Sequence, residues 1–256
     1  MLEIILILCV VILILTFFYK QAVCEFRINQ IEWSQQKDAI GKLLQEKIPL
    51  VVRGIPSASF WSHQDVLVRN QYNNIPIFQE STLSNWIQSA PPYIQCPWSY
   101  SQAELIANIS GIQVWATKWM NSIIINPFMK FWMKPYYRCW AGNIGLRKTY
   151  ATWTCIFPVD SEIMVTILPE NSESFLPASW QGCYPGTLTN SDTPFVADIK
   201  FIDIIIRPGN CLFMPAHWFV SWTGTDKSEK PVMVCEIEYH TPVSYMAFKM
   251  GSRQSK

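Results

Sequence analysis

The sequence has few charged side chains and little of the chemistry that marks the common enzyme classes. Charged residues make up 15% of the chain, and only three of its 256 residues are histidines. The chain contains no GxSxG nucleophile motif, no glycine-rich phosphate loop, no HExxH zinc motif and no close CxxC pair. A net charge of +1, with both signs dispersed, provides no basic surface for nucleic acid. We therefore predict no nucleic-acid partner and no site of these familiar types.

Charge is missing altogether from residues 4–18. Extended to residues 1–19, this apolar run would form a helix of about 28 Å, close to the roughly 30 Å of a bilayer's hydrocarbon core. Tyr19 and Lys20 follow it, as is typical of a membrane interface. We therefore predict a transmembrane anchor over residues 1–20, with the lipid bilayer as its partner.

A cleaved signal peptide is the main alternative to this anchor. It would need a basic segment before the apolar run, but Glu3 is the only charged side chain there, although the small residues at 22–24 would suit cleavage. Lys20, Arg27 and Lys37 follow the run, and the positive-inside rule then favours a cytoplasmic C-terminal domain. We predict a single-pass membrane protein; an organelle or virion membrane would fit as well as the plasma membrane or endoplasmic reticulum.

The cysteines outside the apolar run are scattered. They are odd in number and form no close pair, which indicates reduced, mostly buried thiols and agrees with a cytoplasmic domain. These residues are Cys24, Cys96, Cys139, Cys155, Cys183, Cys211 and Cys235.

The second half of the chain is rich in short β-branched and aromatic runs. Residues 150–157 and 162–169 flank a turn signal at 158–161 and predict a β-hairpin. Further strands are predicted at residues 195–198, 201–207, 211–214, 218–222 and 231–239. Short strands separated by turns at intervals of about ten residues indicate a sandwich or barrel.

The first half mixes helices and strands. The patterns predict helices at 35–46, after a Ser62 cap and at 81–88, with strands at 48–54 and 74–78; residues 105–125 give no clear prediction. Residues 123–138 interleave aromatics with Lys130, Lys134 and Arg138. We interpret this segment as a loop that packs its aromatics on the core and keeps its cations in water. A membrane-surface segment is the alternative.

Four segments in a fixed order carry a resemblance. They are residues 47–54 with Phe60 and Trp61 shortly after, Trp140–Gly145, Ile206–Trp218 and Glu236–Pro242. Together these segments resemble the cupin-like domains related to JmjC hydroxylases, over about residues 35–245. The resemblance implies an α+β fold: a double-stranded β-helix (jelly roll) with helical decoration. It predicts a linker at 21–34, the domain at 35–247 and a disordered tail at 248–256.

Enzymes of this family bind Fe(II) through a His-x-Asp/Glu pair and a later histidine. The resemblance places the pair at positions 149 and 151, or 151 and 153, and the later histidine at 220. Those positions hold Thr149, Ala151, Trp153 and Val220, and the lysine often used to hold 2-oxoglutarate is not evident in residues 162–168. A facial triad needs two imidazoles and a carboxylate. We therefore predict no catalytic, cofactor-binding or metal-binding residues.

One group outside the family pattern could still bind a metal. Glu236, Glu238 and His240 share one face of a predicted strand, and His217 could join them. We interpret this face as the solvated or hydrogen-bonded side of an edge strand. Asp203 and His217 are interpreted as satisfied structural groups.

Three functions follow from these features. The first is a membrane-anchored, non-catalytic cupin-like domain, a pseudoenzyme that acts without cofactor in binding, scaffolding or assembly with a protein partner. The second is an Fe(II)/2-oxoglutarate hydroxylase with unrecognised ligands. The third is a lipid- or carbohydrate-binding module with residues 115–140 near the bilayer. A jelly-roll pocket filled by Trp153 and Val220 would argue against substrate entry.

Overall fold

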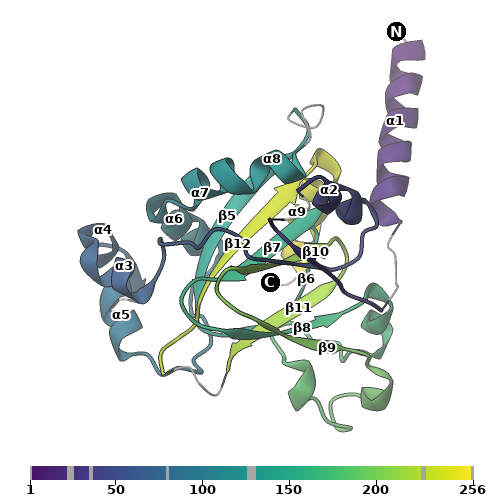
Figure 1. Ribbon diagram of the computed structural model, residues 1–256. Helices are drawn as coiled ribbons and strands as arrows, with labels where there is room; N and C mark the ends of the chain where they lie inside the picture. Colours follow the sequence, from purple (N-terminus) through teal and green to yellow (C-terminus); the bar gives the residue numbers. More distant parts are fainter. Residues whose placement is uncertain are drawn as a thin grey trace.

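The computed structural model describes residues 2–21, 26–34, 37–78, 81–125, 131–225 and 229–254. Two β-sheets form the centre of the domain, and α6, α7 and α8 lie along the outer side of the larger one (Figure 1). The chain is mixed α/β with mostly antiparallel sheets behind an N-terminal apolar helix. The α+β prediction is confirmed at this level.

The larger sheet has six strands in the order β1–β2–β10–β7–β12–β5. The edge strand β1 pairs in parallel with its neighbour β2, and the other pairs are antiparallel. The bounds are β1 (Asn29–Glu32), β2 (Leu50–Arg53), β5 (Lys134–Ala141), β7 (Trp153–Pro158), β10 (Asn210–Pro215) and β12 (Met233–His240). The predicted linker, 21–34, thus contributes strand β1 to the domain.

The smaller sheet has four antiparallel strands in the order β6–β11–β8–β9. Their bounds are β6 (Ile144–Lys148), β8 (Ile163–Leu168), β9 (Ile202–Ile206) and β11 (Phe219–Gly224). The predicted hairpin of residues 150–157 and 162–169 is wrong, because β7 and β8 belong to different sheets. The turn at 158–161 carries the chain from one sheet to the other.

Helices occupy most of the first half. The bounds are α2 (Lys37–Gln45), α3 (His63–Val68), α4 (Asn70–Asn73) and α5 (Leu83–Ser89), with β3 (Pro76–Phe78) and β4 (Ser81–Thr82) forming a small ribbon. Ser62 caps α3, as predicted, by accepting from the Asp65 backbone amide. The segment without a prediction forms α6 (Tyr100–Ser110), α7 (Ile112–Trp119) and α8 (Asn121–Ile124). Gly111, with φ of 93°, separates α6 from α7 and interrupts the helical periodicity.

Two further predictions are wrong. Residues 195–198 are not a strand but include the 3₁₀ turn η4 (Val196–Asp198), which follows two others, η2 (Glu170–Phe175) and η3 (Pro185–Thr187). The predicted tail, 248–256, is helical in its described part, because α9 (Pro242–Gln254) continues to Gln254. Aromatic side chains anchor this helix: Tyr245 stacks on Tyr136, with ring centroids 5.3 Å apart.

The interpretation of residues 123–138 as a core-packed loop is also wrong in its described part. Arg138 is buried, with 1% of its surface exposed, because it lies on β5 beside two glutamates. Phe131 and Trp132 are instead 90% and 56% exposed. Lys134 is exposed as expected, whereas Lys130 lies outside the described residues.

The N-terminal helix α1 (Leu2–Lys20) stands away from the rest of the protein (Figure 1). It is long and apolar enough to cross a membrane, and a signal sequence could have the same length and composition. Its side chains are exposed from Glu3 to Leu15, while Thr16 and Tyr19 near its end are partly covered. The predicted buried thiols are found at four positions: Cys139, Cys155, Cys211 and Cys235.

Candidate functional site

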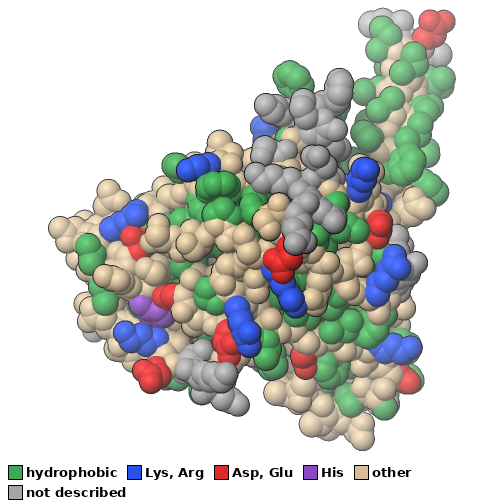
Figure 2. Space-filling model, in the orientation of Figure 1, with side chains coloured by type: hydrophobic (Ala, Val, Ile, Leu, Met, Phe, Trp, Pro, Cys, Tyr) green, Lys and Arg blue, Asp and Glu red, His purple; other side chains and the backbone are tan. Residues whose placement is uncertain are grey.

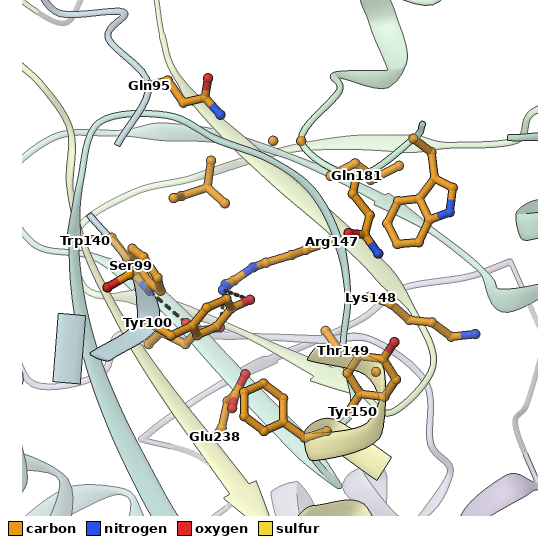
Figure 3. A pocket seen from close by; sticks show the side chains of 18 of the residues that line it. Gln95, Ser99, Tyr100, Trp140, Arg147, Lys148, Thr149, Tyr150, Gln181 and Glu238 are labelled. Carbon is orange, nitrogen blue, oxygen red and sulfur yellow. Dashed lines mark hydrogen bonds and ion pairs between the residues drawn. The ribbon is translucent and has the colours of Figure 1, made fainter. Parts of the chain in front are cut away.

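A cavity of about 260 Å³ opens between the two sheets. Its walls come from β5, β6 and β12, from the segment that leads into α6, from residues 180–182 and from α9. Figure 3 shows Arg147 extending into this space towards Tyr100, with Trp140, Tyr150 and Glu238 around it. We call it the inter-sheet pocket.

Arg147 connects the two sheets across the pocket. It lies on β6, and its Nη2 donates to Glu236 Oε1 on β12. Its Nη1 donates to the Tyr100 hydroxyl at 3.3 Å. Glu236 Oε2 accepts a second hydrogen bond, 2.8 Å long, from Trp140 Nε1. The Glu236 carboxylate therefore faces the four-stranded sheet and accepts hydrogen bonds from both Arg147 and Trp140.

A second ion pair lies next to it on the six-stranded sheet. Arg138 Nη1 is 2.5 Å from Glu238 Oε2 and 3.9 Å from Glu236 Oε2. His240 Nε2 lies 2.9 Å from the same oxygen of Glu238, and its Nδ1 lies 3.3 Å from Ser244 Oγ. The face predicted as an edge is in fact interior and buried, because β12 lies between β7 and β5. The prediction of hydrogen bonding on this face is confirmed and that of solvation is wrong.

Pairing favours the charged forms of Glu238, Arg138 and Arg147. Burial alone would raise the pKa of Glu238, but the Arg138 guanidinium and the His240 ring outweigh it and hold that pKa below its usual range. Burial would lower the pKa of Arg138, yet Glu238 and Glu236 together raise it. The pKa of Arg147 is raised in the same way, with burial opposed first by Glu236. The buried arginines and glutamates of the inter-sheet pocket thus form one charged network, in which the loss of one partner would weaken the pairing of another buried charge.

Aromatic rings enclose the two guanidinium groups. Arg147 Cζ lies 4.7 Å from the ring centre of Trp222 and 5.4 Å from that of Trp140. Arg138 Cζ lies 4.7 Å from the Tyr100 ring and 5.4 Å from the Phe248 ring. These contacts fix the planes of both guanidinium groups.

Part of this network is open to a ligand. Arg147 Nε is buried, and among the described groups it has no hydrogen-bond partner. Gln95 and Gln181 also line the pocket. The pocket can therefore donate hydrogen bonds to an oxygen acceptor on a small polar molecule, or on an inserted side chain.

The positions that the resemblance assigns to iron ligands do not fit an Fe(II) site. Thr149 Oγ1 donates to the carbonyl oxygens of Pro215 and Trp218, at 2.7 and 2.9 Å. Val220 pairs directly with Arg147 across β11 and β6, so it lies on the same face of the sheet as Arg147 without offering a ligand atom. Trp153 pairs with Tyr239 on the side of the six-stranded sheet that faces the helices. Trp153 therefore does not fill the pocket.

The alternative metal site is not assembled either. His240 and Glu238 are in contact, but His217 lies elsewhere, with Nε2 3.2 Å from Tyr19 O and Nδ1 3.9 Å from Glu170 Oε1. Within the described residues, no group of three His, Cys, Asp or Glu side chains could hold a metal ion. The interpretation of His217 as a hydrogen-bonded structural residue is confirmed.

The two arginines are the site residues that sequence reasoning missed. The sequence does carry a signal for them: Arg138 alternates with Trp140 on one strand, and Glu236 alternates with Glu238 on another. This signal can be recognised only when the pairing of the two strands is known. Asp203 was interpreted correctly, since it accepts from Thr166 Oγ1 at 2.6 Å. Neither a protein-family model nor a curated protein matches the sequence.

Proposed function

We propose that this protein is a membrane-anchored, cupin-like domain related to the JmjC hydroxylases, and that it binds a ligand or a protein partner without catalysing a reaction. The strand arrangement supports the fold part of the proposal. From β5 to β12 the chain crosses repeatedly between the two sheets, leaving β5, β7, β10 and β12 in one and β6, β8, β9 and β11 in the other. Such crossing is expected of a jelly roll.

The observation that carries the functional part is the charged network in the inter-sheet pocket. The family uses this space for iron and its co-substrate. Here Glu236 and Glu238, the carboxylates on the pocket side of β12, are already paired with Arg147 and Arg138. Taking Glu236 for a metal would leave the buried Arg147 without its carboxylate partner, and taking Glu238 would deprive Arg138 of its nearest carboxylate; each loss would cost several kcal/mol. The pocket is therefore built for recognition rather than for iron chemistry.

Metal content and co-substrate turnover of the purified full chain test this proposal. The protein is expressed in iron-supplemented cells, purified in detergent without chelator and assayed for bound iron and for succinate release from 2-oxoglutarate. We expect no stoichiometric iron and no release above that of the Arg147→Ala variant. Bound iron with succinate release that depends on the protein would overturn the proposal.

The membrane part of the proposal has its own test. We expect the full chain to stay in the membrane fraction after alkaline carbonate extraction and to keep Met1, because the apolar helix is uncleaved. Protease added to intact cells should spare the domain, since the basic residues after α1 favour a cytoplasmic position. Recovery of a chain that begins after residue 24 would instead identify a signal peptide.

A further inference from the structure

The end of α1 is fastened to the domain at several points. Tyr19 Oη donates to the Tyr150 carbonyl at 2.6 Å, and the Tyr19 and His217 rings lie 4.7 Å apart. Lys47 Nζ donates to the Gln21 carbonyl at 2.9 Å. Lys47 and His217 both have left-handed backbone conformations, with φ of 55° and 72°, which residues other than glycine rarely adopt. Strained residues of this kind persist where their surroundings hold them, and both side chains contact the backbone at the end of α1.

Exposed apolar side chains gather beside this attachment. Helix α9 contacts α1, and its Met246 and Met250, one helical turn apart, are 57% and 71% exposed. The exposed Phe131 and Trp132 come just before β5. The first residue of β5, Lys134, pairs with His240, the last residue of β12, and α9 begins two residues after His240. Figure 1 shows α8, α9 and the start of β5 at the end of the domain from which α1 rises. The four side chains therefore lie on elements at the same end of the domain.

We propose that this face, made of Phe131, Trp132, Met246 and Met250, lies in the headgroup region of the bilayer that α1 spans. The inference rests on the proposed anchor and adds an orientation: one face of the domain contacts the membrane surface, so the domain is not held away from it by a flexible linker. Lipid is the occupant because α9, which carries the exposed Met246 and Met250, contacts the apolar helix α1. Apolar and aromatic side chains beside a spanning helix suit the interface.

The charges near this face fit a phospholipid surface. Lys20 at the end of α1 and Lys134 at the start of β5 are both exposed, and cations close to a membrane attract anionic headgroups. The space-filling view also shows green side chains along α1 and over the upper part of the domain (Figure 2). Tyr150, which lines the inter-sheet pocket, is bonded to Tyr19. The pocket therefore lies immediately beside the membrane interface.

Depth measurements on the full chain test the orientation. An environment-sensitive fluorescent amino acid replaces Met250 or Trp132, one at a time, and the protein is reconstituted into vesicles of phosphatidylcholine and phosphatidylserine with brominated acyl chains. The controls are Val68 on α3 and Ile205 on β9, which are 72% and 55% exposed but lie on other parts of the domain. We expect blue-shifted emission and bromine quenching at 250 and 132, and water-like emission at 68 and 205.

A fifth position separates this inference from the proposed anchor. The same fluorophore at Leu13, which is 69% exposed on α1, reports whether the helix is in the bilayer. Quenching at 13 with water-like emission at 250 and 132 would overturn the docked orientation and leave the anchor standing. Water-like emission at 13 would overturn the anchor itself. Quenching at 250 and 132 without quenching at 13 would overturn the proposal in this form, because the face would then meet lipid without a spanning helix beside it.

Discussion

Arg147 joins the two sheets through one buried carboxylate, so its removal should be costly. Arg147→Ala leaves Glu236 buried without its nearest cation, and we expect the free energy of unfolding to fall by about 3–5 kcal/mol. Urea unfolding in detergent measures the change. Arg207→Ala is the matched control, because Arg207 is 69% exposed and pairs with Glu162 on the surface. That change should cost about 1 kcal/mol or less, and equal losses in the two variants would contradict the network.

Removing both charges of the Arg147–Glu236 pair should destabilise the protein less than removing one of them and leaving the other unpaired. In Arg147→Met with Glu236→Gln, neither buried charge remains unpaired, and the new amide oxygen at position 236 can still accept from Trp140 Nε1, as Glu236 does now. We expect the double variant to be more stable than the sum of the two single changes, by about 1–3 kcal/mol. The double-mutant cycle in urea gives this difference. Strict additivity would show that the two side chains act independently.

His217 makes the stability of the protein depend on pH. Burial lowers the pKa of His217, opposed mainly by the Glu170 carboxylate. The unfolded chain takes up a proton near pH 6.5, whereas folded His217 stays neutral to a lower pH. Stability is therefore complete above pH 6.5 and is lost as the pH falls through 6.5 towards the folded pKa. Melting curves from about pH 7.5 to 5.5 should show this slope, and His217→Gln should reduce it; an unchanged slope would assign it to another group.

At the scale of single elements, α9 depends on a glycine. A Cβ at Gly251 would lie 2.4 Å from the Tyr150 ring, so Gly251→Ala must displace that ring or the helix. Gly41 in α2 has open space around its Cα and is the control. We expect Gly41→Ala to stabilise the protein by about 0.5–1 kcal/mol and Gly251→Ala to destabilise it, both measured by urea unfolding. The same sign for both would contradict close packing between α9 and the pocket wall.

The elements that the sequence predicts well are those with strong local signals. The apolar run predicts α1, Ser62 predicts the start of α3, and the β-branched runs predict most strands of the second half. Sheet assignment was missed for residues 150–157 and 162–169, because a turn signal does not reveal which sheet the next strand enters. The tail was missed for a similar reason: its helix is stabilised by packing on β5 and β12, which the sequence of the tail does not show.

The candidate site was the least predictable part, for a physical reason. The sequence shows Glu236 and Glu238 on one strand, but whether they are solvated depends on which strand lies beside them. Pairing of β12 with β5 brings Arg138 to them, and the second sheet brings Arg147. Both partners come from about 90 or more residues away in the chain. Long-range pairing of this kind follows from the whole fold and not from local pattern.

At the scale of the whole molecule, the buried thiols report on global unfolding. Cys139, Cys155, Cys211 and Cys235 are buried, and burial raises the pKa of Cys155 and of Cys235. We expect these four to resist a thiol reagent in the native protein and to react together when urea unfolds it. Mass spectrometry of the labelled peptides gives the rates. Fast labelling of any one of them in native conditions would reveal a local opening of the core.

The attachment of α1 also decides where a mechanical load would enter the protein. Tyr150 lies between β6 and β7, and His217 lies between β10 and β11, so both hold α1 at places where the chain crosses from one sheet to the other. Tension on the membrane helix would therefore be shared between the two sheets at once. The short parallel pair of β1 and β2 would not carry it alone, and the domain would resist being pulled open from its anchored end.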